Sequence, residues 1–468
     1  MTSVIVIGAG PAGALAALRA ADLGARTTLV TSSGFGGMAA HDGPVPVRTL
    51  AHTARLIREA RQLRQYGIAT SEPVLNYTQL LRRVRDVVDD VVAHSSLRAQ
   101  IETAGVQIYE RAGAARFLDA HTVATEAGLR LEADKIILCV GGVSRTLNVP
   151  GFHLTSTHRT ALELPSIPSS ILVVGGGATG VQLASIFNAF GSRVELFEHG
   201  PRILSTEDHD VSAGVAAGFR KSGIVVRENF GSISSFEKTP AGVRMNFCKD
   251  GHQQAVEAAL IVAAAGWTAD PQGLNLAAAS VAVNAQGFVE VDQYLRTSVS
   301  HIFAAGDVTG RLMLVPPALQ DGFVAASNAV LGPKLPLSQY ANTSAGFTDP
   351  EYARIGLTEM EARKSHDVLV SIVTFDSTMR TIIDGYKEGF CKLVVDRKTA
   401  KILGCHVVGE RAVEIAQVAA IAISTGMTVL DLVQTPLAFP TYTGNLAYAA
   451  AGAARQLDLN VGWQAHKL

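Results

Sequence analysis

The sequence has little cysteine, with only four such residues in a chain of 468. They stand at Cys139, Cys248, Cys391 and Cys405, and none forms a Cys-x-x-Cys or Cys-x-x-x-x-Cys pair. The sequence therefore offers no local dithiol and no zinc knuckle, and we predict no metal site. Four scattered thiols also give no disulfide framework, which suits a reducing compartment.

Long apolar runs and an excess of one charge are also missing. Uncharged runs, such as residues 258–267, fall well short of the roughly 20 residues that a membrane span requires. The 40 basic and 41 acidic residues nearly cancel, so neither nucleic acid nor an anionic membrane is an expected partner. The apolar N-terminus has no basic segment before it and is broken by glycines, unlike a signal peptide. We predict a cytoplasmic protein.

Length and composition indicate a globular protein of several domains. A chain of 468 residues is too long for one hydrophobic core, so about two to four domains are expected. Hydrophobic residues make up 48% and charged residues 17%, which is typical of a compact protein and not of a disordered one.

A unit of strand, glycine-rich turn, helix and strand occurs twice. In the first copy, residues 4–7 form a β-branched run before the turn, and a second strand follows at residues 26–31. In the second copy the two strands are residues 171–174 and 193–198. Both turns have the Gly-x-Gly-x-x-Gly spacing, with Gly8, Gly10 and Gly13 in the first and Gly175, Gly177 and Gly180 in the second.

Each glycine of such a turn has a physical role. The first permits the tight turn, the second lets the backbone approach a pyrophosphate, and the third lets the helix pack on the strand. The pyrophosphate then lies at a helix N-terminus, where unpaired N–H groups and the helix dipole favour negative charge. Two turns in full βαβ context predict two dinucleotide sites in an α/β protein with two Rossmann-like domains.

The remaining pattern places the domain boundaries. Residues 135–140 predict a buried strand that runs toward Gly142, and residues 260–265 predict another that ends at Gly266. From residue 342 onward, alternating strands and a long amphipathic helix indicate a separate α+β domain. The predicted segments are 1–149 and 269–340 for the first dinucleotide domain, 150–268 for the second, and 341–468 for the C-terminal domain.

A third segment resembles a motif of a known family. Residues 302–307 form a strand that ends in Gly306-Asp307, and residues 313–317 open a helix. The segment resembles the flavin-ribityl motif of the pyridine nucleotide–disulfide oxidoreductases, the family of dihydrolipoyl dehydrogenase, glutathione reductase and mercuric reductase. The resemblance covers nearly the whole chain. It implies FAD at the first turn and NAD(P)H at the second, with Asp307 binding the ribityl hydroxyls.

The resemblance also implies further residues around the cofactors. Besides the two turns and Asp307, these are Thr31, Gly36, Gly37, Arg48, Gly113, Gly142, Gly266, Leu314 and Val315. Residues 347–351 and 389–394 look like parts of the family's dimerisation domain. That domain implies a homodimer in which each active site borrows residues from the partner's C-terminal segment.

Two positions bear on the choice of nucleotide. Glu198 closes the second βαβ unit, where a carboxylate accepts hydrogen bonds from a ribose 2′-hydroxyl and repels a 2′-phosphate. NADH is therefore favoured, with NADPH as the alternative. Thr31 takes the matching place in the first unit, where the family usually has glutamate, and its hydroxyl can still bond a ribose.

The chain departs from the family where the family's redox dithiol lies. The Gly-Gly-x-Cys-x-x-x-x-Cys-x-Pro segment corresponds to residues 36–46, with Ala39 and Pro44 in place of the cysteines. Neither side chain is a nucleophile, so thiol-based reduction of disulfides or of mercuric ion is excluded. The C-terminal His-Glu dyad is missing too, because Phe439 and Gly444 stand at its positions.

A further pair has changed beside the flavin. The family's lysine aligns with Arg48, and the glutamate that partners this lysine aligns with Gln182. A cation kept without its carboxylate is expected to raise the reduction potential of the flavin.

These departures predict an electron acceptor other than a disulfide. By resemblance, Ala39 and Pro44 with the partner's Phe439 and the partner's Tyr442 line an apolar pocket that suits a flat acceptor such as a quinone. His41 or Tyr442 is the candidate proton donor. We predict an NADH-dependent quinone reductase, similar to cysteine-lacking members of the family. The alternatives are a soluble transhydrogenase and a degenerate flavoprotein with a binding role, for which a colourless protein would be evidence.

Overall fold

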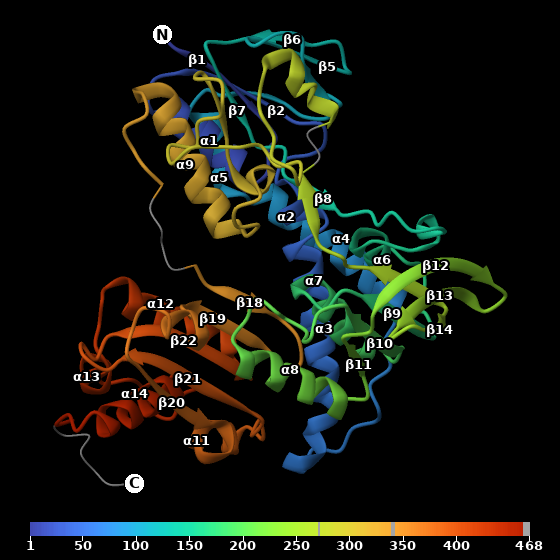
Figure 1. The fold of residues 1–468 in the computed structure, drawn as a ribbon, viewed down its shortest axis with the longest axis vertical. Helices are drawn as coiled ribbons and strands as arrows, with labels where there is room; N and C mark the ends of the chain where they lie inside the picture. The colour runs from blue at the N-terminus through green and yellow to red at the C-terminus, as the bar shows by residue number, and fades with distance from the viewer. Residues whose placement is uncertain (270–271, 338–341, 462–468) are drawn as a thin grey trace. The chain divides into compact units, whose positions relative to one another are not determined.

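The computed structural model describes residues 1–269, 272–337 and 342–461 (Figure 1). They form two compact units. The first unit comprises Met1–Thr49, Asn76–Thr146 and Gly266–Gln339, and the second comprises Leu50–Leu75, Leu147–Ala265 and Tyr340–Leu468. Residues 50–75 belong to the second unit, although they fall within the predicted first segment. The finer division into four segments stays a prediction.

The first unit is built on a parallel sheet of five strands. Its order is β17 (Ile302–Ala304), β7 (Lys135–Leu138), β1 (Ser3–Ile7), β2 (Arg26–Val30) and β3 (Gln107–Tyr109). Central β1 is in register with both neighbours, so that Ile7 lies opposite Val30 and Leu138. All of β1 is buried, as expected for a parallel strand covered on both faces.

Each face of this sheet has its own hydrophobic core. Val4 and Val6 of β1 pack with helices α1 (Pro11–Asp22) and α9 (Val315–Leu331), which lie side by side (Figure 1). Ile5 and Ile7 pack on the other face with a small antiparallel sheet. That sheet consists of β4 (Ala115–Phe117), β5 (Thr122–Thr125) and β6 (Arg130–Glu132). The unit is completed by α2 (Gly37–His41), α4 (Tyr77–Ala93), α5 (Ser96–Thr103) and the antiparallel pair β8 (Gly142–Ser144) and β16 (Trp267–Ala269).

The second unit repeats the parallel arrangement. Its first sheet has the order β11 (Val225–Glu228), β10 (Arg193–Glu198), β9 (Ser170–Val174) and β15 (Leu260–Ala263), with helices α7 (Ala178–Ala189) and α8 (His209–Lys221) following β9 and β10. An antiparallel sheet of β12 (Ser232–Thr239), β13 (Gly242–Lys249) and β14 (His252–Ala258) packs against it. Aromatic side chains, including Phe197, Phe230 and Phe247, meet edge to face between the two.

The C-terminal part of the second unit contains an antiparallel sheet. Its order is β18 (Ser344–Gly346), β19 (Tyr352–Gly356), β22 (Ile402–Gly409), β21 (Gly389–Asp396) and β20 (Val368–Thr374). Helices α12 (Ala412–Ser424), α13 (Val429–Gln434) and α14 (Gly444–Gln456) supply alanine, leucine and valine to its core, while α10 (Glu359–Ala362) and α11 (Met379–Ile383) are short. The predicted combination of two Rossmann-like parts and an α+β part is confirmed.

Helix α3 (Pro44–Gln62) begins in the first unit and ends in the second. Among the described residues, no helix is both long enough and apolar enough to cross a bilayer.

Candidate functional site

Both glycine-rich turns depend on a close approach between strands. Gly8 has φ +104°, and a Cβ there would lie 2.2 Å from the carbonyl oxygen of Cys139, at the end of β7. Gly175 has φ +110°, and a Cβ there would lie 2.3 Å from the carbonyl oxygen of Ala264, after β15. Glycine is required at both places by backbone angle and by space.

The third glycine of each turn brings the helix onto the strand. A Cβ at Gly13 would lie 1.8 Å from the carbonyl oxygen of Gly8, and a Cβ at Gly180 would lie 1.8 Å from that of Gly175. The N-termini of α1 and α7 are therefore fixed at the carboxyl ends of β1 and β9, the edge where α/β proteins bind ligands.

The second glycine of each turn faces open space. Gly10 and Gly177 are the N-cap residues of α1 and α7, with nearly equal angles (φ −71°, ψ −177° and φ −76°, ψ −178°) and no side-chain cap. A Cβ at either residue would meet nothing within 4 Å. Uncapped helix N-termini with free space in front of them fit a pyrophosphate.

A second pair of glycines supports the first turn. Gly36 and Gly37 both have positive φ, and a Cβ at Gly37 would lie 2.8 Å from the Cα of Gly10. The start of α2 therefore rests on the turn at the N-terminus of α1. Thr31, which follows β2, is buried, and its backbone N–H donates to the carbonyl oxygen of Tyr109 at 3.0 Å.

Asp307 lies in a partly buried place close to Gly142. A Cβ at Gly142 would be 3.6 Å from the Cβ of Asp307. Burial and the nearby negative charge of Asp321 raise the pKa of Asp307 to about 6. Asp321 itself is buried and accepts a hydrogen bond from the N–H of Gly306 at 3.2 Å, which holds the turn before Asp307. A desolvated carboxyl group at this position fits a ligand that offers hydroxyl donors.

The other predicted flavin residues have varied surroundings. Leu314 is the N-cap of α9, and Val315 begins that helix. Gly113 has φ +71°, and a Cβ there would lie 2.6 Å from the Cβ of Glu126. The backbone angle and the packing explain this glycine without any contact to a cofactor. Gly266 has φ +100°, and its carbonyl oxygen accepts a hydrogen bond from the N–H of Arg145 at 3.0 Å.

In the second unit, Glu198 is held beside its turn. Its Oε2 accepts a hydrogen bond from the N–H of Gly176 at 2.6 Å, and its Oε1 accepts one from the N–H of Gly200 at 2.6 Å. The carboxylate is therefore oriented at the carboxyl end of β10, next to the turn.

The nearest basic side chains bind backbone carbonyls. The guanidinium of Arg202 donates to the carbonyl oxygens of Leu204, Ser205 and Glu207 at 2.7–3.1 Å. The Nδ1 of His199 lies 2.7 Å from the carbonyl oxygen of Gly231. Both side chains are thus engaged by the protein itself.

The sequence model of the pyridine nucleotide-disulphide oxidoreductases matches residues 2–322, and that of their dimerisation domain matches residues 343–450. This chain belongs to the pyridine nucleotide-disulphide oxidoreductase family. It is therefore an enzyme, an FAD-dependent NAD(P)H oxidoreductase, and the two turns fit the cofactors that the family implies.

Relatives cover nearly the full chain. The dihydrolipoyl dehydrogenase of Bacillus subtilis is 31% identical over 96% of this chain and 98% of its own, and the mercuric reductase of Bacillus cereus is 30% identical over 95% and 70%. Among solved structures, LpdA from Mycobacterium tuberculosis is 26% identical with a TM-score of 0.86, over 96% of this chain and 99% of its own. The flavoprotein disulfide reductase RclA from Escherichia coli, 24% identical with a TM-score of 0.85 over the same shares, shows the fold.

The segment predicted to align with the family's dithiol folds as α2 and the start of α3. Ala39 lies within α2, and Pro44 is the first residue of α3. His41 ends α2, and its Nε2 lies 3.0 Å from the carbonyl oxygen of Phe35. Arg48 is exposed on α3. These four residues all belong to the first unit.

Gln182, Phe439 and Tyr442 belong to the second unit. The Nε2 of Gln182 donates to the carbonyl oxygen of Ala178 at 3.0 Å, and its Oε1 accepts from the N–H of Phe347 at 3.4 Å. Phe439 is 68% exposed. The hydroxyl of Tyr442 donates to the Oδ2 of Asp384 at 3.1 Å. The pairing of Arg48 with Gln182 and the joint pocket stay predictions, because their members lie in different units.

Some residues of the site were missed from the sequence. Asp321 is the only charged residue in the apolar helix α9, which was an available signal. Asp384 is the partner of Tyr442, and no local pattern marks it.

We predict that substitutions of the second glycine in each turn affect different cofactors. Gly10→Ala should leave the melting temperature of the cofactor-free protein near the wild-type value but lower FAD content, because the new methyl group occupies only the pyrophosphate space. Gly177→Ala should keep FAD and raise the Kd for NAD⁺ at least about tenfold. Gly273→Ala is the control, since a Cβ there also meets nothing within 4 Å. Loss of FAD from Gly177→Ala alone would contradict this assignment.

A pH dependence follows from Asp307. Its pKa is raised to about 6 in the folded protein, so the native state binds a proton more tightly than the unfolded state, and stability is lost as pH rises from about 4 to 6. Asp307→Asn should therefore stabilise the cofactor-free protein by about 1–2 kcal/mol at neutral pH and by little at pH 4, after allowance for partial exposure. Thermal melts across this range measure the difference, and a difference independent of pH would overturn the prediction.

Proposed function

We propose that this enzyme passes electrons from NADH through FAD to a quinone or a similar flat acceptor, and not to a disulfide. The observation that carries the proposal is the absence of cysteine from residues 36–46, where Ala39 and Pro44 replace the family's thiols. Neither side chain can form a mixed disulfide.

The four cysteines elsewhere offer no accessible pair of thiols. Cys139 is buried, and burial and the charge of Asp321 raise its pKa, which makes it a poor nucleophile. The thiols of Cys391 and Cys405 contact each other, but both side chains are fully buried in the core of the C-terminal sheet, and the hydrogen bond with Cys391 and burial raise the pKa of Cys405. Cys248 is a free thiol on β13, and no other cysteine belongs to that sheet.

The reaction divides between cofactor and protein. FAD, when bound, accepts a hydride from reduced nicotinamide and returns two electrons to a second substrate. The chain supplies the two uncapped helix N-termini for the pyrophosphates and Asp307 for hydroxyl groups. The overall reaction, NADH + H⁺ + quinone giving NAD⁺ + hydroquinone, balances, because one of the two protons arrives with the hydride and one is added.

The added proton is better supplied by His41 or by water than by Tyr442. The hydroxyl of Tyr442 already donates to Asp384, and burial and the charge of Asp384 raise its pKa, so it is a weak acid. The imidazole of His41 is half-buried, and its Nε2 lies 3.0 Å from the carbonyl oxygen of Phe35. Support for a flat acceptor comes from the apolar residues Ala39 and Pro44 and from the exposed ring of Phe439.

NADH is the proposed reductant. The carboxylate of Glu198 would repel a 2′-phosphate, and the basic side chains beside it, His199 and Arg202, are engaged by backbone carbonyls. Nothing in this loop therefore offers a cation to NADPH.

An anaerobic titration tests this function. NADH should bleach the flavin, a benzoquinone should restore its absorbance, and NADPH should react at least about tenfold more slowly, since a repelled phosphate costs roughly 1.4 kcal/mol or more. Restoration by NADP⁺ but not by quinone would indicate a transhydrogenase instead. A purified protein without flavin, or with a flavin that NADH does not reduce, would refute the proposal.

We also propose that the enzyme is a homodimer, since the family's dimerisation domain is matched over residues 343–450. In that domain α11 exposes Met379, Ile382 and Ile383 next to an open groove of about 310 Å³ lined by Tyr66 and Tyr386. A second copy of the chain is the proposed occupant of this apolar face.

Light scattering tests the dimer. The wild type should have twice the mass of one 49.2 kDa chain, and Ile383→Asp should reduce it to one chain, because a buried unpaired carboxylate is costly. Val283→Asp, at an exposed apolar residue of the first unit, is the matched control. A wild-type monomer, or a dimer that Ile383→Asp leaves intact, would contradict the assignment.

A further inference from the structure

Residues 199–208, between β10 and α8, form a loop that contacts the second glycine-rich turn. We name it the 199–208 loop. The N–H of Leu204 donates to the carbonyl oxygen of Gly176 at 2.8 Å, and a Cβ at Gly176 would lie 2.7 Å from the Cγ2 of Ile203. The loop also begins directly after Glu198, which bonds the N–H of Gly200. Its path therefore determines the shape of the nucleotide site on this side.

The loop has an unusual backbone that needs support. Leu204 has φ +49° and is buried, a conformation that side chains other than glycine rarely adopt. The guanidinium of Arg202 binds the carbonyl oxygens of Leu204, Ser205 and Glu207 and so ties the loop to itself.

Arg354, in β19 of the C-terminal sheet, holds the loop from outside. Its Nη1 donates to the carbonyl oxygen of Thr206 at 2.9 Å, and its Nε lies 3.2 Å from the Oε2 of Glu207. Ser344 donates to the Oε1 of Glu207 at 3.0 Å. Glu207 is buried, and its charge is compensated by Arg354 and Ser344 and by the positive charge of Arg202.

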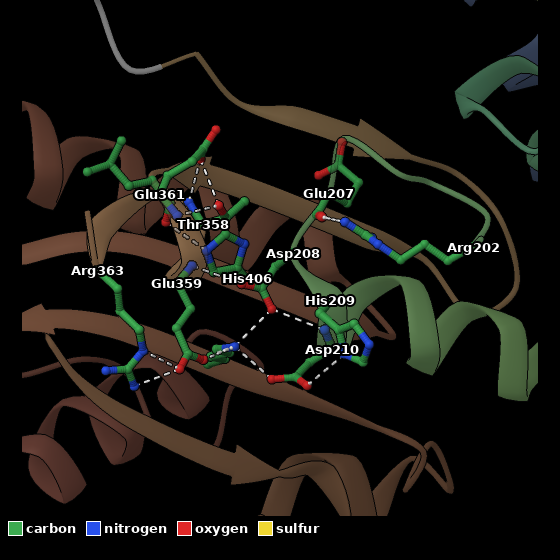
Figure 2. Close-up of polar contacts among 12 residues, drawn as sticks. Arg202, Glu207, Asp208, His209, Asp210, Thr358, Glu359, Glu361, Arg363 and His406 are labelled. Atoms are coloured by element: carbon green, nitrogen blue, oxygen red, sulfur yellow. Dashed lines mark hydrogen bonds and ion pairs between the residues drawn. The ribbon is translucent and has the colours of Figure 1, made fainter. Parts of the chain in front are cut away.

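Lys392, in β21, holds the end of the loop. Its Nζ lies 2.7–2.8 Å from carboxylate oxygens of Asp208, Asp210 and Glu359, and its side chain is only 1% exposed. Asp208 also accepts a hydrogen bond from the N–H of Glu359 at 3.0 Å. Figure 2 shows these three carboxylates facing one another between α8 and the C-terminal sheet.

We infer that Arg354 and Lys392 are positioning residues that fix the 199–208 loop and thereby set the affinity for the nicotinamide nucleotide. The inference rests on the proposed function only in placing that nucleotide at the second turn. Without Arg354, the carbonyl oxygen of Thr206 loses a hydrogen-bond donor and the carboxylate of Glu207 loses its ion pair. The strained Leu204 then relaxes, and its contact with Gly176 changes. All these residues belong to the second unit.

The test is the Kd for NAD⁺, measured by calorimetry on the oxidised, FAD-loaded enzyme, with no electron acceptor present. Arg354→Met should raise this Kd about five- to tenfold and raise KM for NADH, with kcat and FAD content unchanged. Arg354→Lys should recover part of the affinity, because lysine can pair with Glu207 but cannot also bind Thr206 in the same fork geometry. Lys392→Met should act in the same direction.

Lys221→Met is the matched control. Lys221 forms an ion pair with Glu388 between the far end of α8 and the start of β21, so it joins the same two parts away from the loop. Its Kd for NAD⁺ should stay within about twofold of the wild type, as is usual for an exposed pair.

The possible results separate the two proposals. If Arg354→Met unfolds, Glu207→Gln provides the test, because it keeps size and hydrogen-bonding capacity but removes the ion pair. Folded Arg354→Met or Glu207→Gln with wild-type affinity would overturn the inference and leave the proposed function intact. A wild-type enzyme that binds no NAD⁺ would overturn both. If Arg354→Met raises the Kd for NAD⁺ but the wild-type enzyme does not reduce quinones, the inference is supported and the proposed function is not.

Discussion

The structure depends on one repeated contact, in which a helix touches a strand through glycine. A Cβ at Gly13 or Gly180 would lie 1.8 Å from the carbonyl oxygen of the first glycine of its turn. Because no other residue permits this approach, each helix N-terminus lies at the carboxyl edge of a parallel sheet. The C-terminal ends of β10 and β17 lie at the same edges of the two sheets as these helix N-termini. Glu198 and Asp307, which stand at or just after those strand ends, therefore lie on the same side as the glycine-rich turns.

In the second unit, ion pairs hold the loop beside the glycine-rich turn in place, whereas the turn itself is held by close backbone contact. Arg354 and Lys392 neutralise buried carboxylates of the 199–208 loop, and each would be costly to remove alone because the partner charge stays buried. The C-terminal sheet is therefore more than a dimerisation surface, since it also supports the loop that follows Glu198.

Much of the fold and part of the site could be predicted from the sequence. The two turns and Glu198 could be located from local spacing, and Asp307 from the resemblance of its segment to the family's flavin-ribityl motif. The contact of Gln182 with Phe347 and the bond from Tyr442 to Asp384 could not be predicted, because they join elements that are distant in the sequence and meet only on folding. The hydrogen bonds of Arg202 lie within one loop, but they depend on the loop's path, which no sequence pattern indicates.

The central claim is that electrons leave FAD for an acceptor other than a protein disulfide. Counting electrons tests it most directly. The purified enzyme is titrated anaerobically with dithionite while the flavin absorbance is followed. Without a redox-active disulfide, the protein should take up two electrons per FAD before the flavin is fully reduced. An uptake of four electrons per FAD would reveal a reducible disulfide and contradict the account.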